Sequence, residues 1–244
     1  MTDRIEGRNP VMEALLAGRE IEKIYVSGSE GSIRKIIGMA RDRKIPVSEV
    51  SKSRLDEMCE TKAHQGVIAV ITAHSYATVD DIIKRAKDKN EPLFVVILDE
   101  ITDPHNLGSV LRTANGAGVH GIIIPKRNSV GLTGTVAKTS VGAVEYTPVA
   151  RVSNIGAVID RLKEEGVWFY AAHQDAEQSY CETDYSGGVG LVIGNEGKGI
   201  SRLVKEKCDF LLSIPMLGEI NSLNASVAAG ILMYEVVRFK EKKK

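Results

Sequence analysis

Two stretches of the chain contain small and polar residues that could bind a small molecule, each placed directly after a strand-like run. They are LVIGNEGKG, at Leu191–Gly199, and IPMLGEINSLNASVA, at Ile214–Ala228. Each stretch starts apolar and breaks at glycine or proline, and the second then leads into a long apolar helix. Ligands of open α/β sheets bind outside the carboxyl ends of the strands. If the two strands are neighbours, both loops lie at that edge and form the floor of an active site.

A third stretch, LDEITDPHNLGSVLRTANGAG at Leu98–Gly118, precedes these two. The three stretches, in this order, resemble the signature motifs of the SpoU/TrmH family, the 2′-O-ribose RNA methyltransferases of the SPOUT class. The resemblance covers about Glu91–Lys244. Near the start of the chain, EGRNPVMEALLAG and HQGVIAV resemble the small substrate-binding domain of the RlmB-like branch, which acts on 23S ribosomal RNA.

This resemblance implies an α/β fold with two domains. Residues 1–74 are expected to form an RNA substrate-binding domain like the ribosomal proteins L30e and L7Ae, and residues 75–90 a linker that carries a helix. Residues 91–244 would form the methyltransferase domain, with a trefoil knot in its C-terminal half. Independently of the resemblance, the alternation of strands and helices favours a mainly parallel sheet. No GxGxxG sequence follows a strand, so the ordinary dinucleotide-binding motif has no support.

Apolar periodicity and capping residues predict the individual elements. In the first domain, a helix is expected from Asn9, with Asn9 as its N-cap and Pro10 as its first residue. Over both domains, strands are expected at residues 23–26, 45–50, 66–72, 93–98, 121–125, 145–150, 167–172, 190–193 and 210–214. Further helices are expected at residues 30–43, 51–58, 133–140, 153–165 and 224–239, and another is expected to begin near Asn106.

Composition excludes several classes of protein. The chain has 244 residues, 43% of them hydrophobic, which is enough for one or two ordinary cores. It contains no apolar run long enough to span a membrane and no N-terminal signal pattern. Its three cysteines are far apart and its five histidines show no ligand spacing, so neither a disulfide framework nor a metal site is expected. We therefore expect a cytoplasmic protein.

The charge of the chain is balanced, with 32 basic and 32 acidic side chains. A protein that binds RNA usually carries a basic surplus that neutralises phosphates. RNA binding would therefore depend on local clusters, such as the five basic residues between Arg34 and Lys44 or the pair Lys126 and Arg127. An equally good interpretation is that each of these clusters is a solvated helix face or loop.

Methyl transfer to a ribose oxygen requires the sulfonium methyl group and the 2′-oxygen to lie close together and in line. The resemblance implies S-adenosyl-L-methionine as the cofactor, and it implies catalytic roles for Arg112 and Asn106. Arg112 corresponds to an arginine beside the target hydroxyl. Because a guanidinium is hardly ever deprotonated, it would stabilise the developing alkoxide rather than act as a base. Asn106 could instead simply cap its helix.

The other two motifs supply the remaining candidates. Glu196, by resemblance, would orient Arg112 or the substrate, although a carboxylate between glycines is often only a turn residue. Asn224 and Ser222 would face the methyl donor and the ribose, or would cap the last helix. Gly194 would allow the backbone to approach the adenosyl group. Apolar walls and backbone hydrogen bonds to adenine are expected from Ile214 and Leu223.

These residues favour one function and leave alternatives open. The favoured function is 2′-O-methylation of a ribose, expected to be a guanosine, in 23S ribosomal RNA with S-adenosyl-L-methionine. The alternatives are a tRNA 2′-O-methyltransferase, a resistance-type rRNA adenosine methylase, and a non-catalytic RNA-binding or ribosome assembly factor. A homodimer is expected through the last helix, because its apolar residues surround it almost completely.

Overall fold

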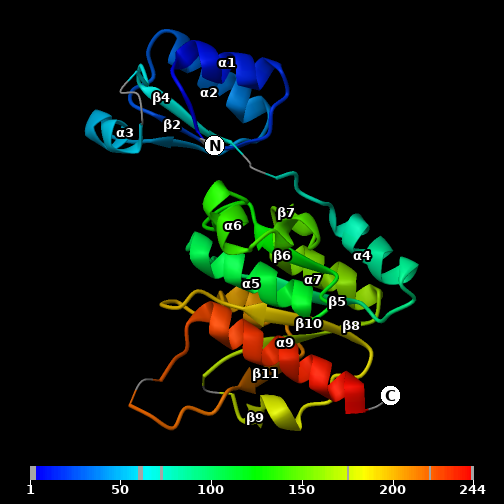
Figure 1. The fold of residues 1–244 in the computed structure, drawn as a ribbon. Coiled ribbons are helices and arrows are strands. Elements are labelled where there is room, and N and C mark those ends of the chain that lie inside the picture. Colours follow the sequence, from blue (N-terminus) through cyan, green and yellow to red (C-terminus); the bar gives the residue numbers. More distant parts are fainter. Residues whose placement is uncertain (1–3, 60–62, 72–73, 175, 220, 243–244) are drawn as a thin grey trace. The chain divides into compact units, whose positions relative to one another are not determined.

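The structure, a computed structural model, describes residues 4–59, 63–71, 74–174, 176–219 and 221–242. The chain divides into two compact units (Figure 1). The first unit comprises Met1–Ser75 and the short segment Gly131–Gly134, and the second comprises Tyr76–Val130 and Thr135–Lys244. None of the helices in the described ranges is long and apolar enough to cross a lipid bilayer.

The first unit is a small α/β unit with a four-stranded sheet in the order β1-β4-β2-β3. Strand β4 pairs antiparallel with β1 and β2, whereas β3 pairs parallel with β2. Its elements are β1 (Arg4–Glu6), α1 (Arg8–Leu16), β2 (Ile21–Val26), α2 (Ser32–Asp42), β3 (Val47–Glu49), α3 (Lys52–Met58) and β4 (Val67–Ile71). Buried side chains of α1, α2, β2 and β4 share one hydrophobic cluster, which holds the unit together.

Two features of the first unit differ from the prediction. Helix α1 begins at Arg8, with Gly7 as its N-cap, rather than after Asn9. Gly7 has a φ of 94°, a turn that glycine makes easily, and Pro10 fits within the first helical turn, where its missing N–H is not needed. Strand β1 was not predicted, because three half-exposed residues carry no clear alternation.

The second unit contains a seven-stranded sheet in the order β7-β6-β5-β10-β8-β11-β9. Every pairing found between its strands in the described ranges is parallel, which confirms the predicted parallel α/β class. Its strands are β5 (Phe94–Leu98), β6 (Gly121–Pro125), β7 (Val149–Val152), β8 (Val167–Ala172), β9 (Gln178–Ser179), β10 (Gly188–Ile193) and β11 (Phe210–Ser213). Its helices are α4 (Val79–Asp88), α5 (Pro104–Gly116), α6 (Gly134–Thr139), η1 (Ala143–Glu145), α7 (Ile155–Glu164), η2 (Tyr180–Glu182), α8 (Arg202–Lys205) and α9 (Ala225–Lys242).

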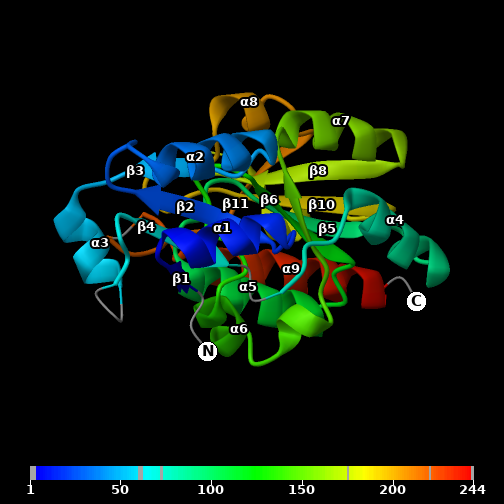
Figure 2. The same ribbon diagram turned by 90° about the horizontal axis from the view of Figure 1, so that it is seen from above.

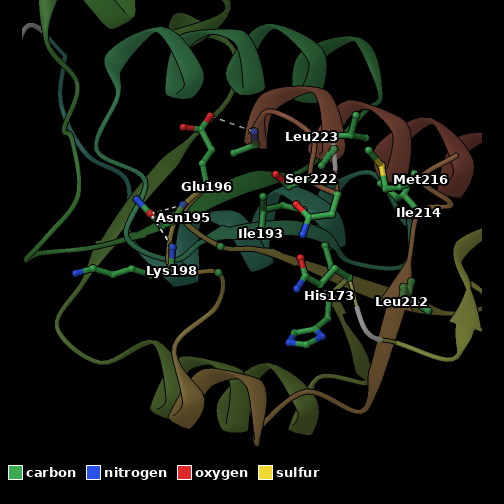
Figure 3. Close-up of a pocket in the computed structure, with 18 residues that line it drawn as sticks. His173, Ile193, Asn195, Glu196, Lys198, Leu212, Ile214, Met216, Ser222 and Leu223 are labelled. Atoms are coloured by element: carbon green, nitrogen blue, oxygen red, sulfur yellow. Dashed lines mark hydrogen bonds between the residues drawn. The ribbon is translucent and has the colours of Figure 1, made fainter. Parts of the chain in front are cut away.

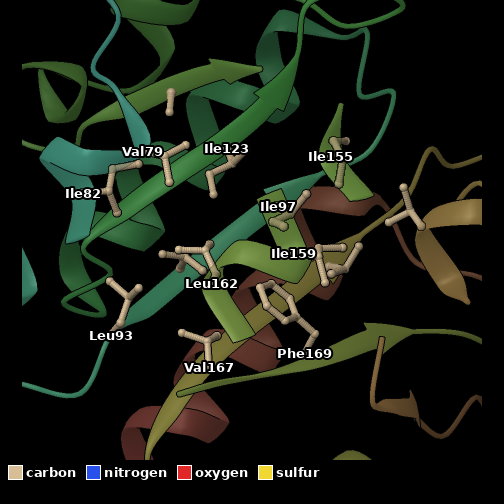
Figure 4. Packing of buried hydrophobic residues seen from close by; sticks show 14 of the residues in the cluster. Val79, Ile82, Leu93, Ile97, Ile123, Ile155, Ile159, Leu162, Val167 and Phe169 are labelled. Atoms are coloured by element: carbon tan, nitrogen blue, oxygen red, sulfur yellow. The ribbon is translucent and has the colours of Figure 1, made fainter. Parts of the chain in front are cut away.

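Helices cover both faces of this sheet (Figure 2). On one face, α4, α7 and α8 pack against alternate residues of the central strands, such as Val95 and Ile97, and form the main hydrophobic cluster (Figure 4). On the other face, α5 and α9 lie against each other, and α9 packs on β10. Because β5 and β10 are covered on both sides, all of their residues are buried, as expected for central parallel strands.

The segment expected to link the domains, 75–90, contains α4, which packs within the second unit. Its residues Val79, Ile82 and Ala86 are buried in the main cluster. A capping box formed by Thr78 and Asp81 fixes its start, since each side chain accepts a hydrogen bond from the other residue's backbone N–H. The helix therefore belongs structurally to the second unit and is not a free connector.

The strand expected at residues 145–150 begins only at Val149. The preceding residues form the 3₁₀ helix η1, which follows Gly142 in a left-handed conformation with a φ of 83°. The short elements β9, η2 and α8 were not predicted, because runs of two to four residues show no measurable periodicity.

One buried histidine makes the stability of the second unit dependent on pH. His120 is 2% exposed; its Nδ1 accepts a hydrogen bond from Phe94 N (3.0 Å) and its Nε2 lies 3.0 Å from Glu91 Oε2. Burial lowers the pKa of His120, because desolvation disfavours the imidazolium. The folded state therefore binds this proton less readily than the unfolded state does.

We expect the free energy of unfolding to fall as the pH drops below the unfolded histidine pKa of about 6.5. Urea titrations of the wild type and of His120→Gln at pH 7.5 and pH 5.5 measure this effect. The glutamine can still accept from Phe94 N but does not titrate, so its loss of stability between the two pH values should be smaller. An equal loss in both proteins would show that His120 contributes nothing to it.

Candidate active site

A pocket of about 280 Å³ lies outside the carboxyl ends of β8, β10 and β11 (Figure 3). This is the edge at which the sequence predicted the two loops to meet, and both loops line the pocket. The lining residues are Ala172, His173, Gln174, Ile193, Gly194, Asn195, Glu196, Gly197, Lys198, Gly199, Leu212, Ile214, Met216, Asn221, Ser222, Leu223, Ala225 and Ala228. Strands β10 and β11 are not neighbours, because β8 lies between them and contributes its own end to the pocket.

The loop after β10 folds back on itself. Asn195 and Gly199 exchange two backbone hydrogen bonds, of 3.0 Å and 2.7 Å. A Cβ atom added to Gly194 would lie 2.2 Å from the carbonyl carbon of Gly199 and 2.3 Å from the nitrogen of Ile200. The returning chain of the loop therefore requires glycine at this position by itself. This requirement does not depend on the predicted approach of an adenosyl group.

The side chain of Asn195 attaches this loop to the end of β5. Its Nδ2 donates to the carbonyl oxygen of Glu100 (3.1 Å), and its Oδ1 accepts from the backbone nitrogens of Gly197 (2.9 Å) and Lys198 (3.2 Å). Glu100 itself has a φ of 59°, an uncommon conformation for a residue other than glycine. The loop is thus held from inside and from the neighbouring strand.

Asp99 provides a second attachment. Its backbone nitrogen donates to the carbonyl oxygen of Ile193 (2.8 Å), and its buried carboxylate accepts from the backbone nitrogen of Ser201 (2.8 Å). Sequence reasoning singled out neither Asp99 nor Asn195. The available signals were an acidic residue directly after a buried strand and an asparagine at the start of a glycine-rich turn.

Three predicted residues meet in one polar cluster beside the pocket. Glu196 Oε1 accepts from Asn106 Nδ2 (2.7 Å) and Asn224 Nδ2 (2.7 Å), and also from the backbone nitrogen of Ala225 (3.3 Å). Asn224 Nδ2 also lies 2.9 Å from Asn106 Oδ1. One carboxylate oxygen thus joins residues from all three motifs, which are up to 118 positions apart.

Of the two asparagines that could each have capped a helix, only Asn224 does so. Asn224 Oδ1 accepts from the backbone nitrogens of Ser226 (2.9 Å) and Val227 (3.4 Å), so it caps α9 while its Nδ2 belongs to the polar cluster. Asn106 does not cap α5. That helix begins at Pro104, and its N-cap Asp103 accepts from His105 N (2.9 Å). Asn106 is 5% exposed and uses its side chain for the cluster.

Arg112 is not brought to the pocket. It lies six residues after Asn106 on α5, about 9 Å further along the helix axis, and its side chain is exposed. It is absent from the residues that line the pocket, whereas the four residues predicted to bind the cofactor, Gly194, Ile214, Ser222 and Leu223, all line it.

The pocket also contains residues that sequence reasoning missed. Gln174 and His173 follow β8, and His173 Nε2 lies 3.4 Å from Lys205 Nζ on α8. Nothing in the sequence around residues 172–174 distinguishes them from an ordinary strand end. Among the described residues, no group of three or more histidine, cysteine, aspartate or glutamate side chains could hold a metal ion.

The fold and the pocket define a parallel α/β enzyme domain that binds a small, partly apolar ligand at the carboxyl edge of its sheet. Residues 93–234 match the SpoU rRNA Methylase family, and residues 4–77 match the domain described as RNA 2′-O ribose methyltransferase substrate binding. The chain belongs to this SpoU/TrmH family of RNA methyltransferases.

Known relatives agree with this assignment. The chain is 48% identical over 238 residues to YacO of Bacillus subtilis, which is named as a TrmH family tRNA/rRNA methyltransferase, and the match covers 97% of this chain and 95% of YacO. The SpoU methyltransferase AviRb of Streptomyces viridochromogenes, crystallised with AdoMet, has a TM-score of 0.63 at 26% identity, over 98% of this chain and 90% of AviRb. An AdoMet-bound rRNA methyltransferase of Sinorhizobium meliloti has a TM-score of 0.61 at 27% identity, over 96% and 86% of the two chains.

The protein is therefore an S-adenosyl-L-methionine-dependent RNA 2′-O-methyltransferase of the SpoU/TrmH type. The pocket fits this cofactor in its chemistry. Ile193, Leu212 and Ile214 supply apolar surface suited to a purine ring, and Ser222 and Asn221 supply polar groups suited to a ribose or an amino acid. The carboxylate of Glu196, at the wall of the pocket, suits a ligand that carries a sulfonium charge.

We expect Gly194→Ala to weaken cofactor binding by about tenfold or more, equivalent to about 1.4 kcal/mol, because the added methyl group must displace the returning chain. Isothermal titration with S-adenosyl-L-methionine measures the affinity. Gly197→Ala is the matched control in the same loop, since its Cβ would meet only Asn195 Oδ1, at an ordinary distance of 3.5 Å. Equal affinities of the two variants would contradict the role of the backbone contact at Gly194.

Proposed function

We propose that the protein methylates the ribose 2′-oxygen of a guanosine in 23S ribosomal RNA. The observation that carries this proposal is the cluster of Asn106, Glu196 and Asn224, built from three separate motifs at the wall of the cofactor pocket. The substrate-binding domain matched at residues 4–77 supports an RNA substrate. The similar Sinorhizobium meliloti enzyme is named as an rRNA methyltransferase, which also supports the proposal. Such a substrate implies a cytoplasmic enzyme.

In the proposed mechanism, the three residues of the polar cluster have different roles. The cofactor, when bound, supplies an electrophilic methyl group. Glu196 Oε1 is occupied by its three donors, whereas Oε2 has no hydrogen-bonding partner in the described part of the chain. We assign Oε2 to the substrate side, where it accepts the ribose hydroxyl or orients Arg112. Asn106 and Asn224 hold the carboxylate in place, so that no reorganisation is needed during transfer.

Arg112 would stabilise the alkoxide that develops on the 2′-oxygen, and we propose that a second copy of the chain supplies it. The side chain is exposed on α5, next to α9. Helix α9 leaves Val227 and Tyr234 exposed, at 50% and 52%. Apolar side chains on a helix surface of this kind suit a twofold interface. In a homodimer through α9, the α5 helices lie beside that interface, and each could present Arg112 to the partner's pocket.

One alternative to ribosomal RNA remains a candidate for the substrate. A tRNA substrate is consistent with the name of YacO, which includes both tRNA and rRNA. A non-catalytic RNA-binding or assembly factor would need no polar cluster at the pocket, so the hydrogen bonds that join Asn106, Glu196 and Asn224 argue against it.

The substrate assignment can be tested with radiolabelled S-adenosyl-L-methionine and transcripts of 23S rRNA, 16S rRNA and total tRNA. We expect label in 23S rRNA, and nuclease digestion with mass spectrometry should identify it as 2′-O-methylguanosine. Label in tRNA alone would replace the rRNA assignment with the tRNA alternative. Folded protein that binds cofactor but labels none of the three RNAs would overturn the proposed substrates.

Arg112→Ala should lower turnover by at least about tenfold, or about 1.4 kcal/mol of activation free energy, and leave cofactor affinity unchanged. Glu196→Ala should also lower turnover. If Arg112 acts across a dimer, a mixture of the two impaired variants should be more active than either variant alone, because heterodimers contain one site with both residues intact. If heterodimers verified by mass spectrometry show no recovery, Arg112 either acts in the site of its own protomer or takes no part in the reaction.

A further inference from the structure

The first unit contains a short, rigid turn at residues 64–66, just before β4. Gln65 and Gly66 both have positive φ angles, of 49° and 82°. This conformation is uncommon for glutamine, and a residue keeps it only where the surrounding structure holds it in place. The turn is formed by the segment HQG, and none of its residues is among those that line the pocket.

Buried contacts hold this turn in place. His64 is 2% exposed; its Nδ1 accepts from the backbone nitrogen of Gly66 (2.9 Å), so its Nε2 carries the proton and donates to Asp56 Oδ1 (3.0 Å). A Cβ atom on Gly66 would lie only 3.1 Å from Ser27 Oγ and 3.2 Å from Ile33 Cδ1. The direction of the Gln65 carbonyl group is therefore fixed from both sides of the turn.

Arg8, 57 positions earlier in the chain, is attached to this turn. Its Nε donates to the carbonyl oxygen of Gln65 (2.9 Å), and its backbone nitrogen donates to Gln65 Oε1 (3.3 Å). Gly7, with its φ of 94°, turns the chain into α1 at this point, and its nitrogen donates to Val67 O (3.1 Å). A guanidinium held through Nε has its plane fixed while its two terminal nitrogens remain available.

In the part of the chain that the structure describes, neither terminal nitrogen of Arg8 has a hydrogen-bonding or ionic partner. The residue is only half-buried, and the exposed Asn9 follows it at the start of α1. The loop before α2 runs alongside, since a Cβ on Gly31 would lie 3.5 Å from Arg8 Nη1. The free end of the guanidinium is thus reachable from solvent and set in a fixed direction between two loops.

We propose that Arg8, oriented by Gln65, binds a phosphate of the RNA backbone and so sets the position of the substrate on the first unit. A planar pair of N–H donors matches two oxygens of one phosphodiester, and such contacts fix the register of a nucleic acid. This inference rests on the proposed RNA methyltransferase function and adds a substrate-positioning residue outside the methyl-transfer pocket. If the hydrogen bond between Arg8 and the Gln65 carbonyl served only to stabilise the fold, one neutral donor would be enough, and an exposed guanidinium would not be needed.

The test uses the full chain and filter binding of a 23S rRNA transcript over a series of potassium chloride concentrations. Arg8→Ala should weaken binding at least about fivefold and lower the slope of log K against log salt by about one. Arg19→Ala is the matched control, since it removes the same charge from an exposed position beyond the other end of α1 and should change affinity less than about twofold.

Arg8→Lys separates charge from geometry. It should keep the wild-type salt slope but not the wild-type affinity, because a lysine cannot hold the Gln65 carbonyl and a phosphate in one plane. Thermal unfolding and cofactor titration of each variant identify any that fails to fold. If Arg8→Ala destabilises the first unit and Arg8→Lys restores it, the comparison between Arg8→Lys and the wild type still decides the point.

Folded Arg8 variants that bind the transcript like the wild type would overturn the inference, as would an equal loss in Arg19→Ala. A failure of the proposed function looks different. In that case no RNA is methylated by the wild type, whereas the dependence of RNA binding on Arg8 can still be measured. Methylation by Arg8→Ala with an unchanged KM for RNA would count against the role of Arg8 and leave the proposed function standing.

Discussion

A single carboxylate oxygen, Glu196 Oε1, joins the parts of the site. Two side-chain amides and one backbone N–H donate to it, and these donors come from the start of α5 and the start of α9. Hydrogen bonds to an ionised acceptor are about twice as strong as neutral ones. A buried amide donor left without its acceptor would also lower the stability of the folded state. The positions of both helix starts and of the loop after β10 are therefore tied to one another.

The arrangement depends on where β10 is inserted in the sheet. Strand β10 pairs with β5 on one side and with β8 on the other, although it follows both in the chain. Its end therefore lies next to Asp99 and Glu100 after β5 and next to His173 after β8. The loop at Gly194–Gly199 is held from the β5 side by Asp99 and Glu100, and the end of β8 on its other side contributes to the pocket, because the strand is central. A loop on an edge strand would have a partner on one side alone.

The structure separates residues that the motifs place close together. Asn106 and Arg112 belong to one helix and one motif, yet the first is buried in the polar cluster and the second is exposed to solvent. Six residues of an α-helix advance the chain by about 9 Å, or about 1.7 turns, so the two side chains leave the helix at different heights and in different directions. Membership in a motif thus indicates a shared function but does not establish a shared location.

The sequence by itself determined the parallel α/β class, the long helices and most strands of the second unit, because strong apolar periodicity is a local property. It also indicated Asn106, Glu196 and Asn224, through their place in recognisable motifs. Only the tertiary structure decided the roles of Asn195 and Asp99, the insertion of β8 between β10 and β11, and the attachment of Arg8 to Gln65. The physical reason is the same in each case: the partner of a hydrogen bond or of a strand lies tens of residues away, and chain direction and packing bring it near, which no local pattern encodes.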